Sequence, residues 1–259
     1  MLQRILLILF LITLTAPAFA GFDEGKKAYD KKDWKTAITE LRPLAEAGDD
    51  RAMILLANMY SDGYGVVPSH EEALKLYKRA AIEKNNPQAM DALGAAYVSA
   101  LGVDQNLQTA LQWFKRSAEL GDQNGAFFYA AIQVQGNKTR PNEIQPDFYN
   151  AYKWFRIAAA ETQSKIFQYY SAQFAQGILA KKLLTFDQAA KADKEAAAWK
   201  PVAVKDLGPP PADPPQAPQI PVPVPASEES PLKNSSLKNS SPPPAAPDKP
   251  LPHSEPLRK

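Results

Sequence analysis

A repeat of about 37 residues is the feature that most constrains how this chain folds. The segment 52–66 reads Ala-Met-Ile-Leu-Leu-Ala-Asn-Met-Tyr-Ser-Asp-Gly-Tyr-Gly-Val, and a similar segment begins 37 residues later, at Ala89. The second half of the unit recurs too, since residues 73–81 match residues 110–118. A third copy starts near Gly125 and carries about five extra residues between its two halves. Periods of this length are typical of proteins built by stacking one small unit on the next.

Each copy of the repeat predicts two helices joined by a glycine turn. In the first copy, the apolar residues of Ala52–Tyr60 recur at three- and four-residue spacing, as on one helix face. Gly63 and Gly65 are expected to end that helix with positive φ, and Ser69 to cap the start of the next one. Alanines, with Gly94 in the second copy, are expected to let paired helices approach closely. Because such a unit cannot bury its apolar face alone, we expect the copies to stack into one continuous core.

The pattern of the second copy carries a family resemblance. Residues 89–118 read Ala-x3-Leu-Gly-x2-Tyr-x4-Gly-Val-x6-Ala-x2-Trp-Phe-x3-Ala, which resembles the Sel1-like repeat, a relative of the tetratricopeptide repeat. The third copy departs more, because Gln133 replaces the tyrosine and Lys138 replaces a turn glycine. The resemblance implies an all-α fold, a right-handed α-solenoid of about ten helices.

The resemblance also divides the chain into parts. It implies a helical solenoid over residues 21–200, and the parts of that solenoid follow in order. They are an N-terminal tetratricopeptide-like hairpin (22–48), three repeats (52–88, 89–124 and 125–160) and a C-terminal helical cap (163–200).

The first 20 residues have the pattern of a secretory signal peptide. Arg4 is followed by an apolar run over 5–14, and Ala18-Phe19-Ala20 places small residues where a signal peptidase reads them. We therefore expect cleavage between Ala20 and Gly21 and a periplasmic or secreted protein. The apolar run is shorter than the roughly 20 residues of a membrane span, although a retained N-terminal anchor remains the alternative. The chain has no cysteine, which excludes both disulfides and a lipid-modified cysteine.

Residues 201–259 differ sharply in composition from the repeats. They hold 18 of the 24 prolines, and their six basic and six acidic residues cancel. A segment of this kind cannot bury enough apolar surface to offset its chain entropy. We therefore predict a proline-rich disordered tail that is extended and partly polyproline II, and that acts as a semi-rigid spacer or as a docking strand.

A search for catalytic chemistry finds no candidate. The chain has two histidines, His70 and His253, and neither belongs to a zinc-binding or nucleophilic motif. Asp49 and Asp50 are interpreted as helix-start residues, where a carboxylate stabilises the positive end of the helix dipole. The net charge of +2 offers no case for nucleic acid or for an anionic membrane surface. We predict no catalytic residue, no metal site and no cofactor.

The aromatic residues are assigned mainly to packing between helices. This holds for the Trp-Phe pairs of the second and third copies, at 113–114 and 154–155. Phe127, Phe128 and Tyr129 are three consecutive aromatics on one helix, so they cannot all face the core. At least one of them is expected to be exposed, where it would serve as a binding anchor.

The resemblance suggests where a partner would bind. In related repeats the first helix of each unit lines the concave surface, and the non-core residues of those helices here are Lys26, Tyr29, Asn58, Asp91 and Phe127. We predict these five residues as a partner-binding set, with ordinary solvent exposure as the competing interpretation.

Two functions remain open from the sequence. The resemblance implies a non-enzymatic scaffold or adapter that binds other proteins in the bacterial cell envelope, with the partners unidentified. The alternative is a protein that binds peptidoglycan or, less in keeping with the residues, hydrolyses it. The cysteine-rich relatives that bind or hydrolyse β-lactams carry a cysteine pair in each repeat, and this chain has no cysteine. A purely structural spacer is a third reading.

Overall fold

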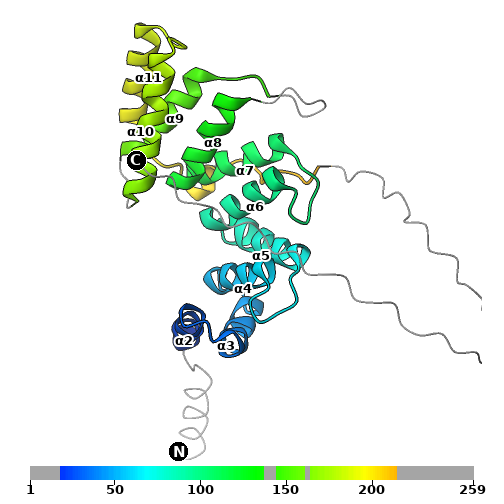
Figure 1. The fold of residues 1–259 in the computed structure, drawn as a ribbon. Coiled ribbons are helices and arrows are strands. Elements are labelled where there is room, and N and C mark those ends of the chain that lie inside the picture. The colour runs from blue at the N-terminus through cyan, green and yellow to red at the C-terminus, as the bar shows by residue number, and fades with distance from the viewer. Residues whose placement is uncertain (1–17, 137–143, 161–163, 215–259) are drawn as a thin grey trace, which may run out of the picture. The chain divides into compact units, whose positions relative to one another are not determined.

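The described part of the chain is entirely α-helical apart from turns and loops. In a computed structural model, residues 18–136, 144–160 and 164–214 are described, and they form ten α-helices and a short 3-10 helix, Val204–Asp206 (Figure 1). The helices are α2 (Ala18–Asp30), α3 (Trp34–Glu46), α4 (Asp50–Asp62), α5 (His70–Glu83), α6 (Pro87–Ser99), α7 (Leu107–Glu119), α8 (Gln123–Gln135), α9 (Phe148–Ala160), α10 (Lys165–Ala180) and α11 (Phe186–Ala198). The predicted all-α fold is confirmed, while the handedness of the superhelix stays a prediction.

The helices pack as a series of hairpins. Helix α2 pairs with α3, α4 with α5, α6 with α7 and α8 with α9, and each hairpin packs against the next. At the end of the series, α10 and α11 both pack against α9. The first helices α6, α8 and α10 also contact one another in turn. The stack therefore has one face made by first helices and another made by second helices.

Side-chain caps mark the helix starts and recur with the repeat. Asp49, Asn86 and Asp122 accept a hydrogen bond from a backbone N–H in the first turn of α4, α6 and α8. The same role at second helices is taken by Asp33, Ser69, Asn106, Asp147 and Thr185. The predicted capping roles of Ser69 and Asp49 are confirmed. Such caps satisfy N–H groups that the helix itself leaves without a partner.

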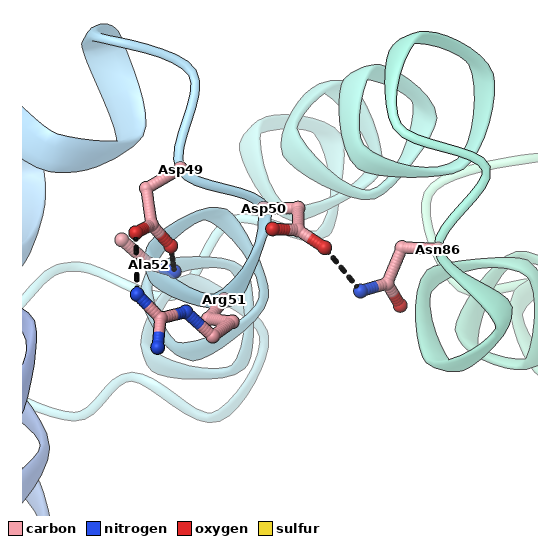
Figure 2. A network of polar contacts seen from close by, with 5 residues as sticks. All are labelled: Asp49, Asp50, Arg51, Ala52 and Asn86. Atoms are coloured by element: carbon pink, nitrogen blue, oxygen red, sulfur yellow. Dashed lines mark hydrogen bonds and ion pairs between the residues drawn. The ribbon is translucent and has the colours of Figure 1, made fainter.

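One cap also joins two neighbouring repeats (Figure 2). Asp49 accepts hydrogen bonds from the backbone N–H of Ala52 at 3.0 Å and from the Arg51 guanidinium at 2.9 Å. The next residue, Asp50, accepts a hydrogen bond of 2.6 Å from the side-chain amide of Asn86. Because Asn86 in turn caps α6, the starts of α4 and α6 are tied to each other.

The predicted glycine turns adopt the expected backbone conformation. Gly63 and Gly65 have φ of 75° and 72°, and Gly102 in the second copy has φ of 71°. The residue that ends α6 is Ala100, which adopts φ of 57° where the first copy has Gly63. An alanine tolerates this left-handed conformation less well than a glycine does.

Small residues allow the helices of the core to approach closely. A Cβ atom on Gly94 would lie 2.7 Å from the Phe114 ring, which confirms the predicted close approach there. A Cβ on Gly125 would lie 2.6 Å from the Ser117 Cβ and 2.8 Å from the backbone nitrogen of Ala118. Buried alanines recur along the whole stack, from Ala28 to Ala192. The predicted core positions of the Trp-Phe pairs at 113–114 and 154–155 are confirmed, since all four side chains are buried.

We predict that Gly125→Ala destabilises the fold while Gly177→Ala does not. The new methyl group at 125 meets α7, and overpacking of this kind lowers the free energy of unfolding by about 1–3 kcal/mol. Gly177 lies within α10 with nothing within 4 Å of its added Cβ, so alanine there stabilises the helix by about 0.5–1 kcal/mol. Urea unfolding followed by circular dichroism measures both changes. Equal effects at the two positions would contradict the close packing of α7 on α8.

Candidate functional site

All five residues of the predicted binding set lie on first helices, but they differ in exposure. Lys26 is exposed on α2 and forms an ion pair of 2.6 Å with Asp30, one turn further along the helix. Tyr29, Asn58 and Phe127 are half-buried. The role of all five residues in binding stays a prediction.

Tyr29 and Asn58 meet in a polar contact between the first two hairpins. The Tyr77 hydroxyl on α5 donates a hydrogen bond to the Asn58 side chain on α4. Burial, followed by the charge of Asp62, raises the pKa of Tyr29, and a hydrogen bond with Asn58 partly offsets this rise. Tyr29 also packs edge-on against Trp34, with ring centroids 5.5 Å apart. These two predicted residues therefore already have partners within the stack.

Asp91 carries a carboxylate that is shielded from solvent between α6, α7 and the start of α8. Its two carboxylate oxygens are buried and accept no hydrogen bond from the described residues. The nearby hydroxyl of Ser117 donates instead to the carbonyl of Pro87. Burial, reinforced by the negative charge of Asp122, raises the pKa of Asp91 to about 9. Asp91 is therefore neutral at physiological pH.

The three consecutive aromatics of α8 divide between the core and the surface as predicted. Tyr129 is buried, Phe127 is half-buried and Phe128 is 39% exposed. Phe127 lies at the centre of an aromatic cluster, with ring centroids 5.4 Å from Phe167 and 5.8 Å from Phe174, both on α10. Phe127 therefore packs against the side of α10 that faces α8.

Helix α10 presents a row of large apolar side chains to solvent. Tyr169 and Tyr170 are 60% and 50% exposed, and Phe174 is 44% exposed. We call the exposed apolar residues of α10 and of the turn after it the α10 surface, namely Ile166, Tyr169, Tyr170, Phe174, Leu179 and Leu183. Four of them, Ile166, Tyr169, Tyr170 and Phe174, follow at three- and four-residue spacing on one side of α10, and clustered exposed apolar side chains mark interaction sites more often than scattered ones do.

A groove runs along the α10 surface. It has a volume of about 400 Å³ and is bounded on one side by Val134 of α8. Its lining is Val134, Tyr169, Tyr170, Gln173, Phe174, Gly177, Ile178, Lys181 and Leu183. Gln173 and Lys181 are the only side chains with amide or charged groups in that lining. The groove is therefore suited to large apolar side chains rather than to a charged or highly polar ligand.

The α10 surface was missed from the sequence, although a signal for it exists. Within Lys165–Ala180, apolar side chains fall on more than one face of the helix, with Ser171, Ala175 and Ile178 buried and Tyr169, Tyr170 and Phe174 exposed. As with residues 127–129, adjacent aromatic residues such as Tyr169 and Tyr170 cannot both face the core of one helix packing. In the described residues, no further hairpin packs over α10, and the sequence did not predict this.

The polar side chains of the described residues form no constellation suited to metal binding. No group of three or more His, Cys, Asp or Glu side chains gathers there in metal-binding geometry. His70 is half-buried at the start of α5, with Nδ1 3.4 Å from the Ser61 hydroxyl oxygen. None of the described helices combines the length and apolar character needed to span a bilayer.

Stacked helix hairpins with recurring caps and glycine turns define a helical-repeat scaffold protein. The chain belongs to the Sel1 repeat family, and its three Sel1 repeats cover residues 50–85, 87–122 and 126–162. The first two segments contain the hairpins α4–α5 and α6–α7, and the third covers α9 and all but the first three residues of α8.

Two solved structures share the fold. One is a protective antigen present in uropathogenic Escherichia coli strains, which displays an SLR fold. It is 24% identical, with a TM-score of 0.56 over 71% of this chain and 39% of that one. The other is a Sel1 repeat protein from Oxalobacter formigenes, also 24% identical, with a TM-score of 0.53 over 72% of this chain and 77% of that one. At this identity the likeness shows the fold alone.

A curated relative matches a short part of the chain. It is an exopolysaccharide production negative regulator from Rhizobium leguminosarum bv. viciae, 37% identical over 73 residues. The match spans 28% of this chain and 27% of the regulator.

The buried carboxyl of Asp91 predicts how stability depends on pH. Above about pH 4 an unfolded aspartate is ionised, whereas folded Asp91 keeps its proton up to about pH 9. Folding therefore takes up a proton in this range, and the free energy of unfolding falls as the pH rises. Asparagine binds no proton in this range, so we predict that Asp91→Asn gains on the wild type by about 1.4 kcal/mol for each pH unit between about pH 5 and about pH 8.

Urea unfolding at several pH values measures this difference, with Asp104→Asn as the matched control. Asp104 is exposed in the loop before α7, so its replacement should leave the pH dependence unchanged. The same slope against pH in Asp91→Asn and the wild type would contradict the assignment.

Proposed function

We propose that this protein is an exported adapter that binds a partner protein in the bacterial cell envelope. Sel1 repeats generally mediate protein–protein interactions, and the repeats here form such a scaffold. The observation that carries the proposal is the α10 surface, which offers aromatic side chains and a groove on the outside of the stack. Its mechanism is shape and surface complementarity on a preorganised scaffold.

The chemistry of the groove indicates the kind of segment that binds there. Tyr170 and Phe174 line it, and buried tyrosines are among the residues that dominate binding energy in protein interfaces. Phe127 packs against Phe174 from below, so the aromatic ring is held in place before a partner arrives. The groove therefore fits a partner segment that presents one or two large apolar side chains, with Gln173 and Lys181 at hand for its polar groups.

Binding to cell-wall glycan is the second candidate. It is favoured by the exposed rings of Tyr169 and Tyr170, since aromatic rings stack on sugars. Recognition of a sugar also needs several placed hydrogen-bonding groups, and the lining of the groove is mainly apolar. This balance favours a protein partner.

Export is the part of the proposal that rests on the first 20 residues. Residues 1–17 lie outside the described part of the chain, and α2 begins at Ala18. Cleavage between Ala20 and Gly21 would leave the buried residues of α2, Phe22, Gly25 and Ala28, in the mature protein. The proposed cleavage is thus compatible with the packing of α2 on α3.

We predict that a photo-crosslinking residue at position 170 captures a partner that the same residue at position 64 does not. Tyr64 is also an exposed tyrosine, but it lies in the loop after α4, far along the chain from α10. The captured protein is then purified and titrated against the intact chain. Tyr170→Ser should weaken its binding about 30-fold, which corresponds to roughly 2 kcal/mol at an interface anchor, and Tyr64→Ser should not.

Equal capture at both positions would remove the α10 surface from the proposal. Sedimentation with purified peptidoglycan tests the second candidate in parallel. Wild-type protein that pellets with the cell wall, and Tyr170→Ser that does not, would replace the protein partner by glycan.

We predict that the exported protein begins at Gly21. Mass spectrometry of the protein from a periplasmic or culture fraction measures its first residue. Ala20→Leu should block processing, because signal peptidase requires a small residue before the cut, and the precursor should then stay with the membrane. Wild-type protein that retains Met1 would contradict cleavage and favour the N-terminal anchor.

A further inference from the structure

The first part of the proline-rich tail lies against the second-helix face. Residues 201–214 follow α11 and return toward α7, as the orange end of the coloured chain shows in Figure 1. They contact α7, α6 and α5 in that order through hydrogen bonds and an ion pair. The sequence left open whether the tail is a semi-rigid spacer or a docking strand, and residues 201–214 are docked. The remaining residues of the tail, 215–259, lie outside the described residues.

The segment is held first at the end of α7. The backbone N–H of Val202 donates a hydrogen bond of 2.7 Å to the carbonyl of Glu119. Further on, the Arg116 guanidinium donates to the carbonyl of Gly208 and, at 3.1 Å, to the Asn85 side chain. Arg116 therefore connects the loop before α6 with the backbone of the tail segment. These contacts recognise main-chain groups, which any extended peptide would offer.

Prolines follow directly after the Gly208 contact. Residues 209–212, Pro-Pro-Pro-Ala, line a shallow hollow of about 300 Å³ together with Gln112, Lys115, Arg116 and Glu119 of α7. A run of three prolines favours the extended polyproline II conformation, which loses little entropy when it binds. The prolines therefore form one wall of the hollow, and the preformed extended chain crosses α7 beside it.

Asp213 provides the second anchor, on the next repeat. Its carboxylate lies 2.8 Å from the Lys78 ammonium on α5 and accepts a hydrogen bond of 2.9 Å from the Tyr97 hydroxyl on α6. Partial burial opposes ionisation, but these two donors prevail and lower the pKa of Asp213. Tyr97 is almost fully buried, so its hydroxyl forms part of the floor of the site. A carboxylate at this point is therefore matched by one charged and one neutral donor.

The segment is held at few points. Most of its residues are exposed, and the Asp213 side chain itself is 60% exposed. An ion pair in such a setting strengthens binding by about fivefold at most. The docked segment is thus retained largely because it is covalently tethered, which gives it a millimolar effective concentration. A competing peptide of the same chemistry, supplied by a partner, can therefore displace it.

We propose that the second-helix face over α5 and α7 is a recognition site for an extended proline-rich segment that carries an acidic residue, and that a partner protein supplies this segment by displacing residues 201–214. The partner's ligand has a backbone carbonyl for Arg116 and, five residues later, a carboxylate for Lys78 and Tyr97. This surface is separate from the α10 surface, so either assignment can fail without the other.

The test uses a fluorescently labelled peptide with the sequence of residues 201–218 and the intact chain, with anisotropy as the readout at low salt. Asp213→Asn in the chain weakens the tethered competitor, so the peptide should bind this variant about three- to fivefold more tightly than the wild type. Asp206→Asn is the matched control, because it removes the same charge from the same segment away from Lys78. Adding Lys78→Met to Asp213→Asn should abolish the gain.

Two further measurements control for loss of the fold and for the role of the carboxylate of the peptide. Circular dichroism checks that every variant keeps its helicity. A peptide with asparagine in place of the aspartate that corresponds to Asp213 should bind about three- to fivefold more weakly to the Asp213→Asn chain. Equal binding to all variants, or a gain that survives Lys78→Met, would overturn the site. Sedimentation of the wild type as a dimer that Asp213→Asn dissociates would assign the site to the tail of a second copy and overturn the partner assignment.

Discussion

Close contact between helices at small residues is the constraint on which the rest of the structure depends. Each hairpin is too small to bury its own apolar face, so its stability comes from the hairpins on either side. Gly94 beneath Phe114, and Gly125 against α7, bring neighbouring helices near enough for the aromatic side chains to fill the remaining space. The recurring caps also connect neighbouring hairpins, because Asn86 both caps the start of α6 and donates a hydrogen bond to Asp50 at the start of α4. Stacking of this kind fixes one face of first helices and another of second helices, and it determines which side chains remain available to a partner.

The two candidate surfaces follow from how the stack ends. Helices α10 and α11 both pack on α9, and no described hairpin follows to cover the outer side of α10. Its aromatic residues stay exposed there, supported from below by Phe127. On the other face, the chain leaving α11 turns back over α7 and reaches Lys78 and Tyr97 through Asp213. The first surface is open and apolar, whereas the second is polar, anchored by charge and occupied by the protein's own tail. A scaffold with two such surfaces has the means to hold two partners, or one partner at two points.

The sequence predicted most of the fold because the determining signals are local and repeated. The 37-residue period, the turn glycines Gly63 and Gly65 and the cap Ser69 each act within one unit, and three copies reinforce one another. The sequence did not predict that Ala100 would adopt the left-handed turn conformation, since nothing local distinguishes this alanine from the helical ones around it. It placed the proposed binding residues on the first helices, but the raised pKa of Asp91 depends on its burial and on the charge of Asp122, 31 positions further along the chain. The contact of Asp213 with Lys78 joins residues 135 positions apart, and no pattern in the sequence announces it.

Hydrogen exchange of the intact chain, read residue by residue, tests most directly whether the described repeats and the returning segment form one structure. The Val202 amide, which donates to Glu119, should exchange more slowly than the same amide in an unstructured peptide. Asp213→Asn should speed exchange in 202–208 while the helices keep their protection. A Val202 amide that exchanges at the rate of an unstructured peptide in the wild-type protein would contradict the docked segment and leave the second-helix face uncovered.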